Sequence, residues 1–551
     1  MKYASGLNSE MLRRTPDSIW DIVCERAEVL GDKVYLNFID DGVTLAYRET
    51  QQRAAAIGRG LLKAGMVRGG KVGLLLMGSS LHVLAWFGSI SASLVDVPIN
   101  PEFRGEVLDH AITKTDVAAL FVDDSGLAAL HSASGHCRSR ISLIVAPDAV
   151  HSAALERKNV PSGIGRFMSV SDLERLGRDE EKLAAIDPKA LTSIRFSSGT
   201  TGLPKGVMMD HGHMLASARK FNDMMSFGAQ DIMYTCFPFH HVFATITGVL
   251  STMCSGGSMI VARKFSASRY WKDIREYQVT RAHVLDPLVP MLMKQPSSEL
   301  DRKHRVKVMY TAAGHYPEFE ERFGIRIIAL YDMSELTVVV HYPEGIERRA
   351  GSCGKESGLF DVRIIDDAGA EVPVGTDGEM TVRPRYPNIM FLGYYNDSDQ
   401  TVERWRDLWF HTGDRGKRDE DGYYYFLGRV GDRIRRRGVN ISAEQIEKVA
   451  LAHEDILECA AIAVPSPLGE DDIKLCARLA AGASLRPADI ASYLAGALPK
   501  ALTVRYVEIL ELLPKTQTEK VQRVALRRMG KQGLTESTWD HETERYWRLP
   551  S

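Results

Sequence analysis

The sequence predicts an α/β fold with a large N-terminal domain and a small mobile α+β C-terminal domain. The N-terminal domain is expected to hold two stacked, doubly wound βαβ subdomains and a small β-barrel-like subdomain. A length of 551 residues suggests roughly three or four domains or subdomains. Short apolar runs alternate with helical patterns as far as about residue 330, which favours parallel βαβ units. From Gly351 to Gly428, short strands and turn residues at hairpin spacing replace that alternation.

The domain boundaries follow from these changes of pattern. The N-terminal core is predicted at 1–428, with subdomains at about 1–190, 191–345 and 346–428. The C-terminal domain is predicted at 429–551.

The first subdomain has the clearest helical and strand patterns. Apolar residues at helical spacing predict amphipathic helices at Asp17–Leu30 and Gln51–Ala64. Buried strands are predicted at Val72–Met77, Leu94–Ile99 and Val117–Val122.

The apolar stretch from Val72 to Val95 has a second interpretation, a membrane span. A spanning helix needs about 20 apolar residues, whereas Gly78, Ser79 and Ser80 interrupt this stretch. We therefore expect a strand, a turn and a buried helix, and no membrane span.

The second subdomain repeats the alternation, and we expect it to stack on the first. Its strands are predicted at Asp231–Pro238, Ser258–Ala262, Arg281–Leu285, Val306–Thr311 and Ile325–Leu330. In the C-terminal domain, the pattern predicts helices and strands at Ala443–Ala452, Leu457–Val464, Ile473–Leu479 and Pro487–Leu498. The polar and aromatic tail after about Gly530 is expected to be poorly ordered.

The composition excludes several classes of partner and location. A net charge of −2 gives no basic surface for nucleic acid, and the run from Arg433 to Gly438 has no interleaved aromatic residues. The seven cysteines form no C-x-x-C pair, which argues for a reducing compartment and against structural zinc or disulfides. The N-terminus lacks the apolar region of a signal peptide. We therefore predict a cytoplasmic protein.

The segment Arg195–Val207, RFSSGTTGLPKGV, carries the strongest chemical signal. Its hydroxyl groups and glycine backbone N–H groups suit a polyphosphate, and Lys205 adds a positive charge. The segment is not a Walker A loop, because Lys205 precedes Gly206 rather than following a glycine. The alternative is a solvated linker without a ligand, but linkers seldom contain a lysine and a proline in such a run.

This segment resembles the phosphate-binding signature of the adenylate-forming superfamily: acyl-CoA synthetases, adenylation domains of peptide synthetases and firefly luciferase. The C-terminal half most resembles bacterial acyl-CoA ligases that activate carnitine or fatty acids. The resemblance covers essentially the whole chain. It implies that the ATP phosphates are bound by Ser197, Ser198, Gly199, Thr200, Thr201, Gly202 and Lys205, with Thr200 also near the metal.

The segment FPFHHVFAT, from Phe237 to Thr245, resembles the superfamily segment with a histidine three positions after a proline. That histidine is His241, which the resemblance makes the residue that steers the acyl carboxylate and gates its tunnel. His240 and Phe243 would line the acyl pocket. The alternative for both histidines is packing at a strand end.

Two further segments resemble the superfamily's adenine-binding motifs. The segment YTAAGH would place adenine against Ala312, Ala313 and Gly314, with Gly314 also at the acyl pocket; a tight βα turn is the alternative. In YDMSELT the resemblance assigns the nucleotide to Tyr331, Asp332, Met333 and Ser334, and Mg²⁺ to Glu335. The alternative is a coincidental Ser–Glu turn. Asp332 stands where the family has glycine, which adds a charge beside the base.

In WFHTGDRG, Asp414 follows a glycine, as many turn-forming aspartates do. The resemblance instead assigns Asp414 to the ribose hydroxyls and Arg429 to ribose and phosphate. It makes Gly431 the hinge and puts Arg435 near the acyl-adenylate, with CoA approached by Arg437 and Gly438.

The segment LPKTQTEKVQR contains Lys520, which is ordinarily a solvated loop lysine. The resemblance makes Lys520 the catalytic lysine that bridges the carboxylate and the α-phosphate. Glu519 replaces the usual glycine there, so the loop is expected to be stiffer.

Together these motifs imply an ATP- and Mg²⁺-dependent acid–CoA ligase that acts on a small-molecule carboxylic acid, as a monomer or homodimer. Two alternatives stay open: an adenylating enzyme that loads a carrier protein, and a nucleotide-binding homologue with reduced catalysis, which Asp332 and Glu519 motivate.

Overall fold

The structure is a computed structural model, and it describes most of the chain. The described ranges are 17–179, 181–197, 203–286, 288–311, 316–343, 346–429, 434–436, 439–441, 443–466, 471–499, 502–515 and 521–548. Within them, the backbone alone is described for Arg435, Arg436, Val439, Asn440, Glu444 and Gln445.

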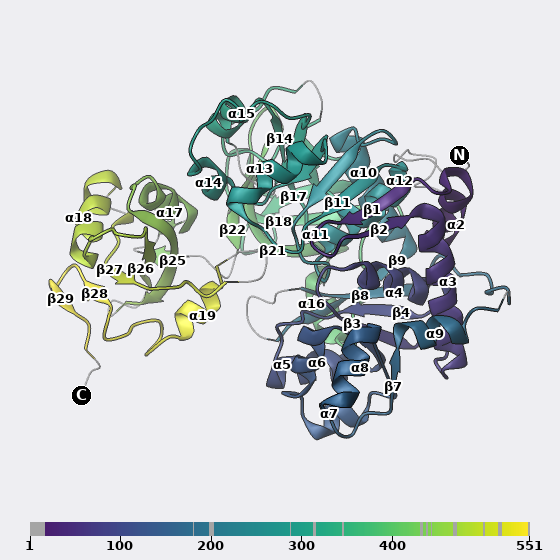
Figure 1. The fold of residues 1–551 in the computed structure, drawn as a ribbon. Helices are drawn as coiled ribbons and strands as arrows, with labels where there is room; N and C mark the ends of the chain where they lie inside the picture. The colour runs from purple at the N-terminus through teal and green to yellow at the C-terminus, as the bar shows by residue number, and fades with distance from the viewer. Residues whose placement is uncertain are drawn as a thin grey trace. The chain divides into compact units, whose positions relative to one another are not determined.

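The first sheet runs in the order β19-β9-β8-β4-β3-β5-β6-β7 (Figure 1). Parallel pairing joins β8 through β7, whereas β9 is antiparallel to β8 and β19 to β9. The predicted strands at 72–77, 94–99 and 117–122 are all confirmed. The bounds are β3 Lys71–Leu75, β4 Val95–Pro98, β5 Val117–Val122, β6 Leu143–Ala146, β7 Arg166–Ser169, β8 Leu191–Ser197, β9 Lys205–Asp210 and β19 Gly393–Tyr394.

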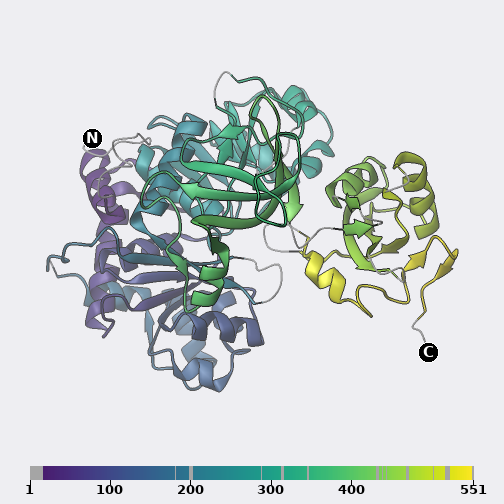
Figure 2. The ribbon, with the colours of Figure 1, turned by 180° about the vertical axis from the view of Figure 1, so that it is seen from behind.

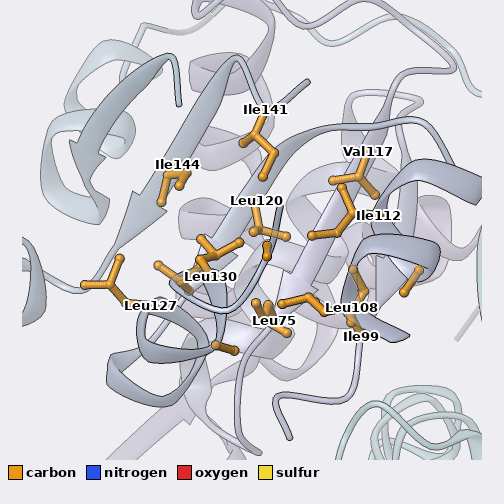
Figure 3. Close-up of a cluster of buried hydrophobic side chains, with 14 of the residues drawn as sticks. Leu75, Ile99, Leu108, Ile112, Val117, Leu120, Leu127, Leu130, Ile141 and Ile144 are labelled. Carbon is orange, nitrogen blue, oxygen red and sulfur yellow. The ribbon is translucent and has the colours of Figure 1, made fainter. Parts of the chain in front are cut away.

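One face of this sheet carries a large apolar cluster (Figure 3). Side chains from β3, β5 and β6 meet those of two neighbouring helices, α5 (Gly105–Lys114) and α6 (Asp124–Leu130). The labelled members are all buried: Leu75, Ile99, Leu108, Ile112, Val117, Leu120, Leu127, Leu130, Ile141 and Ile144. Burial of this apolar surface is the main force that holds α5 and α6 on the sheet.

A second group of helices packs closely around α3 (Tyr47–Lys63). Its neighbours are α2 (Ile19–Leu30), α4 (Ser80–Ser91) and α9 (Val170–Leu176). A Cβ on Gly88 of α4 would lie 2.7 Å from Cγ2 of Ile57 and 3.1 Å from the carbonyl oxygen of Ala54, both on α3. The absence of a side chain at position 88 therefore lets α3 and α4 approach each other.

Helix α4 explains the apolar stretch that resembled a membrane span. Every residue from Leu81 to Ser91 is buried inside the protein. Among the residues that the structure describes, no helix combines the length and the apolar composition needed to cross a bilayer.

The second sheet runs in the order β16-β15-β14-β13-β12-β10-β11-β1-β2. Figure 1 labels β14, β11, β1 and β2 of this sheet. All strands predicted between 231 and 330 are confirmed in it, and β1, β10, β11, β12, β13 and β14 form its parallel part. The bounds are β1 Val34–Phe38, β2 Val43–Ala46, β10 Ile232–Thr235, β11 Ser258–Val261, β12 Arg281–His283, β13 Val308–Thr311, β14 Arg326–Tyr331, β15 Val340–His341 and β16 Lys355–Glu356.

The predicted subdomain ranges 1–190 and 191–345 do not coincide with the two sheets. Residues 34–46 belong to the second sheet, because β1 pairs with β11 in parallel. Residues 191–210 belong to the first sheet, because β8 pairs with β4 in parallel. Strand pairing over long sequence separations overrides the order of the chain, and local patterns do not reveal it.

The remaining helices of the N-terminal part lie between these strands in the sequence. The predicted strand at 231–238 ends at Thr235, and a helical stretch that contains the π-helix η1 begins at Val242. The bounds are α7 Gly135–Ser139, α8 Asp148–Glu156, α10 His211–Met225, α11 Val242–Ala244, η1 Thr245–Leu250, α12 Ser251–Ser255, α13 Ala267–Glu276, α14 Leu288–Met293 and α15 Pro317–Phe323.

The predicted β-rich segment forms a third sheet, in the order β17-β18-β21-β20 with β22 paired to β21. Strand β21 is antiparallel to both β18 and β22. The short strand β19 leaves this segment and joins the first sheet. The bounds are β17 Phe360–Ile365, β18 Gly378–Pro384, α16 Ser398–Arg404, β20 Trp405–Arg406, β21 Trp409–Arg418 and β22 Tyr424–Arg429.

The C-terminal residues form a mixed sheet in the order β25-β26-β27-β28-β29, with α17 against β25 and α18 against β27 (Figures 1 and 2). The four elements predicted between 443 and 498 are confirmed. The bounds are β23 Ile434–Arg436, β24 Val439–Ile441, α17 Ala443–Leu451, β25 Ile456–Pro465, β26 Asp471–Leu479, α18 Pro487–Ala497, β27 Tyr506–Ile509, α19 Arg523–Arg528, β28 Trp539–Asp540 and β29 Arg545–Tyr546.

The expectation of a poorly ordered tail after Gly530 is wrong for the residues described as far as 548. Strands β28 and β29 extend the sheet beyond β27. The buried ammonium of Lys474 contacts Glu508 and the carbonyl of Gly533, and it donates to Thr538 Oγ1 at 3.2 Å. The buried ammonium of Lys474 therefore holds the C-terminal tail to the sheet. The polar composition of the tail gives no indication of this contact.

The described residues divide into two compact units. Residues 17–362 and 383–409 form the first, and residues 363–382 and 410–548 form the second, apart from the gaps given above. The two units are described separately below.

Candidate functional site

The two strands on either side of the predicted phosphate-binding segment form a β-hairpin in the first unit. Strand β8 ends at Ser197 and β9 begins at Lys205, and these two residues pair across the hairpin. The predicted ligands Ser198, Gly199, Thr200, Thr201 and Gly202 lie outside the described residues. The described part of the hairpin thus holds a hydroxyl and an ammonium group at the two ends of this segment.

The ammonium of Lys205 is held by one residue of β19, the partner strand of β9, and by one residue of α16. Its Nζ contacts Oε1 of Gln400 on α16 and lies 5.3 Å from the centroid of the Tyr394 ring. Burial lowers the pKa of Lys205, and the positive charge of Arg404 lowers it further. Carboxylates at Asp397 and Glu335 oppose that shift.

The carboxylate of Glu335 is fixed by the same tyrosine. Glu335 is only 5% exposed, and its Oε1 accepts a hydrogen bond of 2.8 Å from the Tyr394 hydroxyl. The carbonyl oxygen of Glu335 accepts from the N–H of Phe391 at 2.8 Å. Tyr394 therefore brings together the predicted phosphate ligand Lys205 and the predicted metal ligand Glu335.

The sequence prediction missed Tyr394 and Gln400. The segment around them carries turn residues and was assigned to the small β-rich subdomain. Pairing of Gly393 and Tyr394 with Met208 and Val207 of β9 brings them to Lys205. A two-residue strand has no periodicity that reveals such pairing.

The two predicted adenine segments follow neighbouring parallel strands, β13 and β14. Tyr331 is buried and ends β14. Ala312, Ala313 and Gly314 lie outside the described residues, directly after the last residue of β13.

Asp332 replaces the glycine of the superfamily motif and is exposed. Its Oδ2 accepts a hydrogen bond of 3.4 Å from the buried hydroxyl of Tyr310. Burial and the Asp332 carboxylate both raise the pKa of Tyr310, which keeps the phenol protonated. Met333 and Ser334 follow, half-buried, and lead into Glu335.

The histidine segment lies at the start of a helical stretch of the first unit. Nδ1 of His241 accepts a hydrogen bond from the N–H of Phe243 at 3.3 Å, so the side chain caps α11. A neutral imidazole that accepts at Nδ1 carries its proton at Nε2. Loss of hydration, His241 and Arg195 lower the pKa of His240, which favours its neutral form.

Phe243 joins the histidine segment to the adenine side. Its ring is buried and packs on those of Phe237, His283 and Tyr310, with centroid distances of 5.0, 4.5 and 4.8 Å. The Phe243 ring therefore links the histidine segment to Tyr310, the first residue of the segment YTAAGH.

In the second unit, Asp414 lies in a β-bulge rather than in a hairpin turn. The pairing of β18 with β21 shifts between Glu379 and Thr381, and Gly413 there has a φ of +71°. A glycine adopts this left-handed conformation without a Cβ clash. The bulge turns the Asp414 side chain inward, where it is 2% exposed.

The two predicted ribose ligands contact each other in the second unit. Asp414 and Arg429 pair across β21 and β22, and Nε of Arg429 lies 2.8 Å from Oδ1 of Asp414. Glu379, which the sequence prediction missed, holds the bulge: its two carboxylate oxygens bind Nδ1 of His411 at 2.9 Å and the N–H of Gly413 at 3.0 Å.

The predicted residues of the C-terminal domain lie largely outside the described residues. These are the hinge Gly431, the CoA residues Arg437 and Gly438, and the catalytic Lys520. The backbone of Arg435 belongs to β23, where it pairs with Asn440 of β24.

The residues on either side of the Lys520 segment are closely held. Lys515 forms a β-bridge with Val521 and contacts Glu458. Arg523 donates to both carboxylate oxygens of Glu447 at 2.7 and 2.8 Å. The two described residues that flank the Lys520 segment, Lys515 and Val521, thus pair with each other in the second unit.

Among the described residues, no group of three or more His, Cys, Asp and Glu side chains is arranged to hold a metal ion. A magnesium ion differs from such metals because it binds through one or two carboxylates together with substrate phosphates. Glu335, a buried carboxylate beside Lys205, fits that requirement.

Two curated relatives span almost the whole chain. A sulfoacetate–CoA ligase from Cupriavidus necator is 27% identical over 528 residues, which is 94% of this chain and 99% of that protein. A crotonobetaine/carnitine–CoA ligase from Salmonella paratyphi B is 26% identical over 517 residues, which is 91% of this chain and 97% of that protein.

The fold is shared with the anthranilate CoA ligase AuaEII, solved in complex with anthranoyl-AMP. The two structures superimpose with a TM-score of 0.81 at 22% sequence identity, over 93% of this chain and 97% of that one. The predicted fold class is thereby confirmed.

The family assignment rests on two matches within the sequence. Residues 445–520 match the AMP-binding enzyme C-terminal domain. Residues 23–395, more than half of the chain, match the AMP-binding enzyme family. These matches confirm the resemblance seen in the motifs, and this chain belongs to the AMP-binding enzyme family.

Proposed function

We propose that this enzyme is an ATP-dependent acid–CoA ligase. In the first step, a substrate carboxylate attacks the α-phosphate of ATP, which forms an acyl-adenylate and releases pyrophosphate. In the second, the thiol of CoA attacks the acyl carbon, which forms the thioester and releases AMP. The family assignment and the two curated relatives, both CoA ligases, support this reaction.

The observation that carries the proposal is the arrangement of Lys205, Tyr394 and Glu335. The tyrosine hydroxyl binds Glu335 at 2.8 Å while its ring lies beside the Lys205 ammonium. We propose that Lys205 binds ATP phosphate oxygens and that Glu335 holds a Mg²⁺ ion on the same phosphates. The cations offset negative charge that grows on the phosphates during transfer.

The acyl end of the reaction is assigned to the histidine segment. We propose that His241 donates from Nε2 to the substrate carboxylate and orients it toward the α-phosphate. His240, Phe243 and Gly314 would line the acyl pocket. The hydrogen bond from the Phe243 N–H to Nδ1 of His241 fixes the imidazole ring, so that Nε2 is held in place to donate to the substrate carboxylate.

The remaining roles belong to the nucleotide and to CoA. We propose that Asp414 binds the ribose hydroxyls, with Arg429 holding the carboxylate in place. Lys520 is proposed to act in the first step, and Gly431 to be the hinge between the steps. The other proposed ligands are Ser197 to Gly202, Ala312, Ala313, Tyr331 to Ser334 and Arg435 for the nucleotide, with Arg437 and Gly438 for CoA.

We also propose that the enzyme acts in the cytoplasm, as a monomer or homodimer. All seven cysteines are free thiols and six of them are buried, which suits a reducing compartment.

An acid panel tests this function. The purified chain is incubated with MgATP and acids of the kinds named for its relatives: sulfonated, quaternary-ammonium, aromatic and aliphatic. Pyrophosphate release reports the first step, and mass spectrometry detects a thioester after addition of CoA or of a phosphopantetheinyl carrier protein. We expect acid-dependent pyrophosphate and an acyl-CoA.

Two other results would contradict the proposal. Transfer to the carrier protein with none to CoA would show a carrier-loading enzyme. ATP binding without pyrophosphate release for any acid would show a nucleotide-binding homologue.

A further inference from the structure

A buried ion pair connects the first sheet to the histidine segment. Arg195 on β8 and Asp96 on the neighbouring strand β4 are each at most 1% exposed, and Nη2 lies 3.2 Å from Oδ2. Desolvation raises the pKa of Asp96 to about 6, although Arg195 opposes that shift. The charge of Arg195 thus favours the ionised form of this carboxylate.

Hydrogen bonds extend from this pair to the backbone of His241. Ser193 Oγ donates to Asp96 Oδ2 at 3.1 Å and accepts from Nε of Arg195 at 2.8 Å. Nη1 of Arg195 donates to Oγ1 of Thr245 at 3.1 Å. The Thr245 hydroxyl in turn donates to the carbonyl oxygen of His241 at 3.0 Å.

The guanidinium is held from a further side. It lies 5.2 Å from the ring centroid of Trp86, which is buried in α4. Asp96, Ser193, Trp86 and Thr245 come from four elements, so a shift of any of them disturbs the arginine. The donor to Thr245 is therefore fixed in position.

Stability alone does not account for a charged pair in this place. Removing two charges from water costs several kcal/mol per ion, and apolar side chains of similar volume are often as stable or more so. Asp96 lies between Val95 and Val97 in a strand that is otherwise apolar. What the pair supplies that apolar residues lack is the directed hydrogen bond to Thr245.

The position of Arg195 along β8 is equally informative. It lies two residues before Ser197, so both side chains lie on the same face of the strand. The strand that leads into the phosphate-binding segment therefore also holds the segment that carries His241.

We propose that Arg195, held by Asp96, is a positioning residue for His241: through Thr245 it fixes the His241 carbonyl and so the orientation of the imidazole. The inference rests on the proposed function, in which His241 orients the acid. Arg195 itself touches neither substrate. Its loss therefore impairs use of the acid and leaves the affinity for ATP unchanged.

The first test separates the hydroxyl of Thr245 from its shape. Thr245→Val keeps the volume but removes the link, and Thr245→Ser keeps the hydroxyl. With the acid that gives the highest wild-type rate in the panel, we expect kcat/KM for the acid to fall about tenfold or more in Thr245→Val. We expect the KM for ATP to stay near wild type, and Thr245→Ser to restore the rate.

The second test removes the pair as a whole. The double variant Asp96→Val with Arg195→Leu leaves no unpaired charge in the core, so we expect it to fold. It should show the same loss for the acid as Thr245→Val. Wild-type kinetics in both variants would overturn the proposal and leave the pair a purely structural role. If the double variant fails to fold, the comparison of Thr245→Val with Thr245→Ser decides.

Crystal structures provide a readout that needs no activity. We expect the His241 ring of Thr245→Val to rotate away from its capping position on Phe243, and that of Thr245→Ser to keep it. An unchanged ring in Thr245→Val would contradict the positioning role. Absence of pyrophosphate from the wild type with every acid would instead contradict the proposed function, and the ring orientation would still test this inference.

Discussion

The hydroxyl of Tyr394 donates a hydrogen bond of 2.8 Å to Oε1 of the buried Glu335. Because this hydrogen bond fixes Oε1, it also fixes the direction of Oε2, the second carboxylate oxygen of Glu335. The ring of the same tyrosine lies beside the ammonium of Lys205, so one side chain sets the spacing of a cation and a carboxylate. Substitutions at this residue should therefore affect phosphate and metal binding together.

Tyr394→Phe should raise the Mg²⁺ requirement of pyrophosphate release. It removes a hydrogen bond to a charged group, worth about 1.5–3 kcal/mol, or roughly ten- to a hundredfold in the half-saturating Mg²⁺ concentration. Magnesium titrations at fixed ATP measure this. Tyr395→Phe is the matched control, because the Tyr395 hydroxyl binds Asp116 instead. Equal Mg²⁺ dependence in both variants would contradict the role of Tyr394.

Asp414→Ala should raise the KM for ATP by about tenfold or more, since hydrogen bonds to a carboxylate contribute about 1.5–3 kcal/mol. The structural basis is the bulge that holds this carboxylate next to Arg429. Pyrophosphate release at varied ATP is the measurement, with the exposed turn residue Asp421→Ala as control. Unchanged ATP dependence in Asp414→Ala would refute the ribose assignment.

Lys520→Ala should abolish adenylate formation but largely spare thioester formation from acyl-AMP supplied in the assay. The reason is that the lysine is proposed to offset charge at the α-phosphate, which the second step does not attack. The two half-reactions are assayed separately, and the exposed Lys531→Ala is the control. Equal loss of both half-reactions would argue against a role limited to the first step.

His283→Gln should make the protein less sensitive to acid. Burial lowers the pKa of His283 from 6.5 to about 3. Between pH 6.5 and pH 3, this histidine therefore takes up a proton when the protein unfolds. This contribution to stability is fully present above pH 6.5 and is lost as the pH falls toward 3, by about 1.4 kcal/mol per pH unit. Urea unfolding of wild type and variant between pH 6.5 and 4.5 measures the difference in slope. The exposed His136→Gln should keep the wild-type slope, and a wild-type slope in His283→Gln would disprove the assignment.

Gly88→Ala should destabilise the first unit by about 1–3 kcal/mol, the usual cost of overpacking. The added methyl would meet Ile57 and the backbone of α3. Gly496→Ala is the opposite case, because a Cβ there meets nothing within 4 Å and the residue lies in α18. We expect that control to gain up to about 1 kcal/mol from helix propensity. Denaturant unfolding gives both values, and similar effects at the two sites would be inconsistent with close contact of α3 and α4.

Local patterns predicted the fold class and most of its elements. Strands such as Val117–Val122 are continuous apolar runs with clear ends, and their prediction is confirmed. The predicted boundary at about residue 190 does not separate the two sheets, because β1 pairs with β11 and β8 pairs with β4. Such pairing over long separations leaves no local periodicity.

In the candidate site, too, some residues could be predicted from the sequence and others could not. Lys205 was predicted from the chemistry of its own segment, whereas Glu335, His241 and Asp414 were predicted from the resemblance of their segments to superfamily motifs. The residues that hold them, such as Tyr394 and Glu379, come from strands distant in sequence and resemble ordinary sheet residues. The contacts that create the site therefore depend on the three-dimensional fold and leave no mark in any local segment.

The pairing of β1 with β11 has a consequence for biosynthesis. About 220 residues separate the two strands. At a translation rate of about 5–20 residues per second, β11 is synthesised roughly 10–45 s after β1 and β2. During that time an apolar strand with Tyr35, Leu36 and Phe38 stays without its final neighbour. We therefore expect a chain that is shortened from its C-terminal side past residue 258 to leave this hairpin without its partner strand and prone to aggregation.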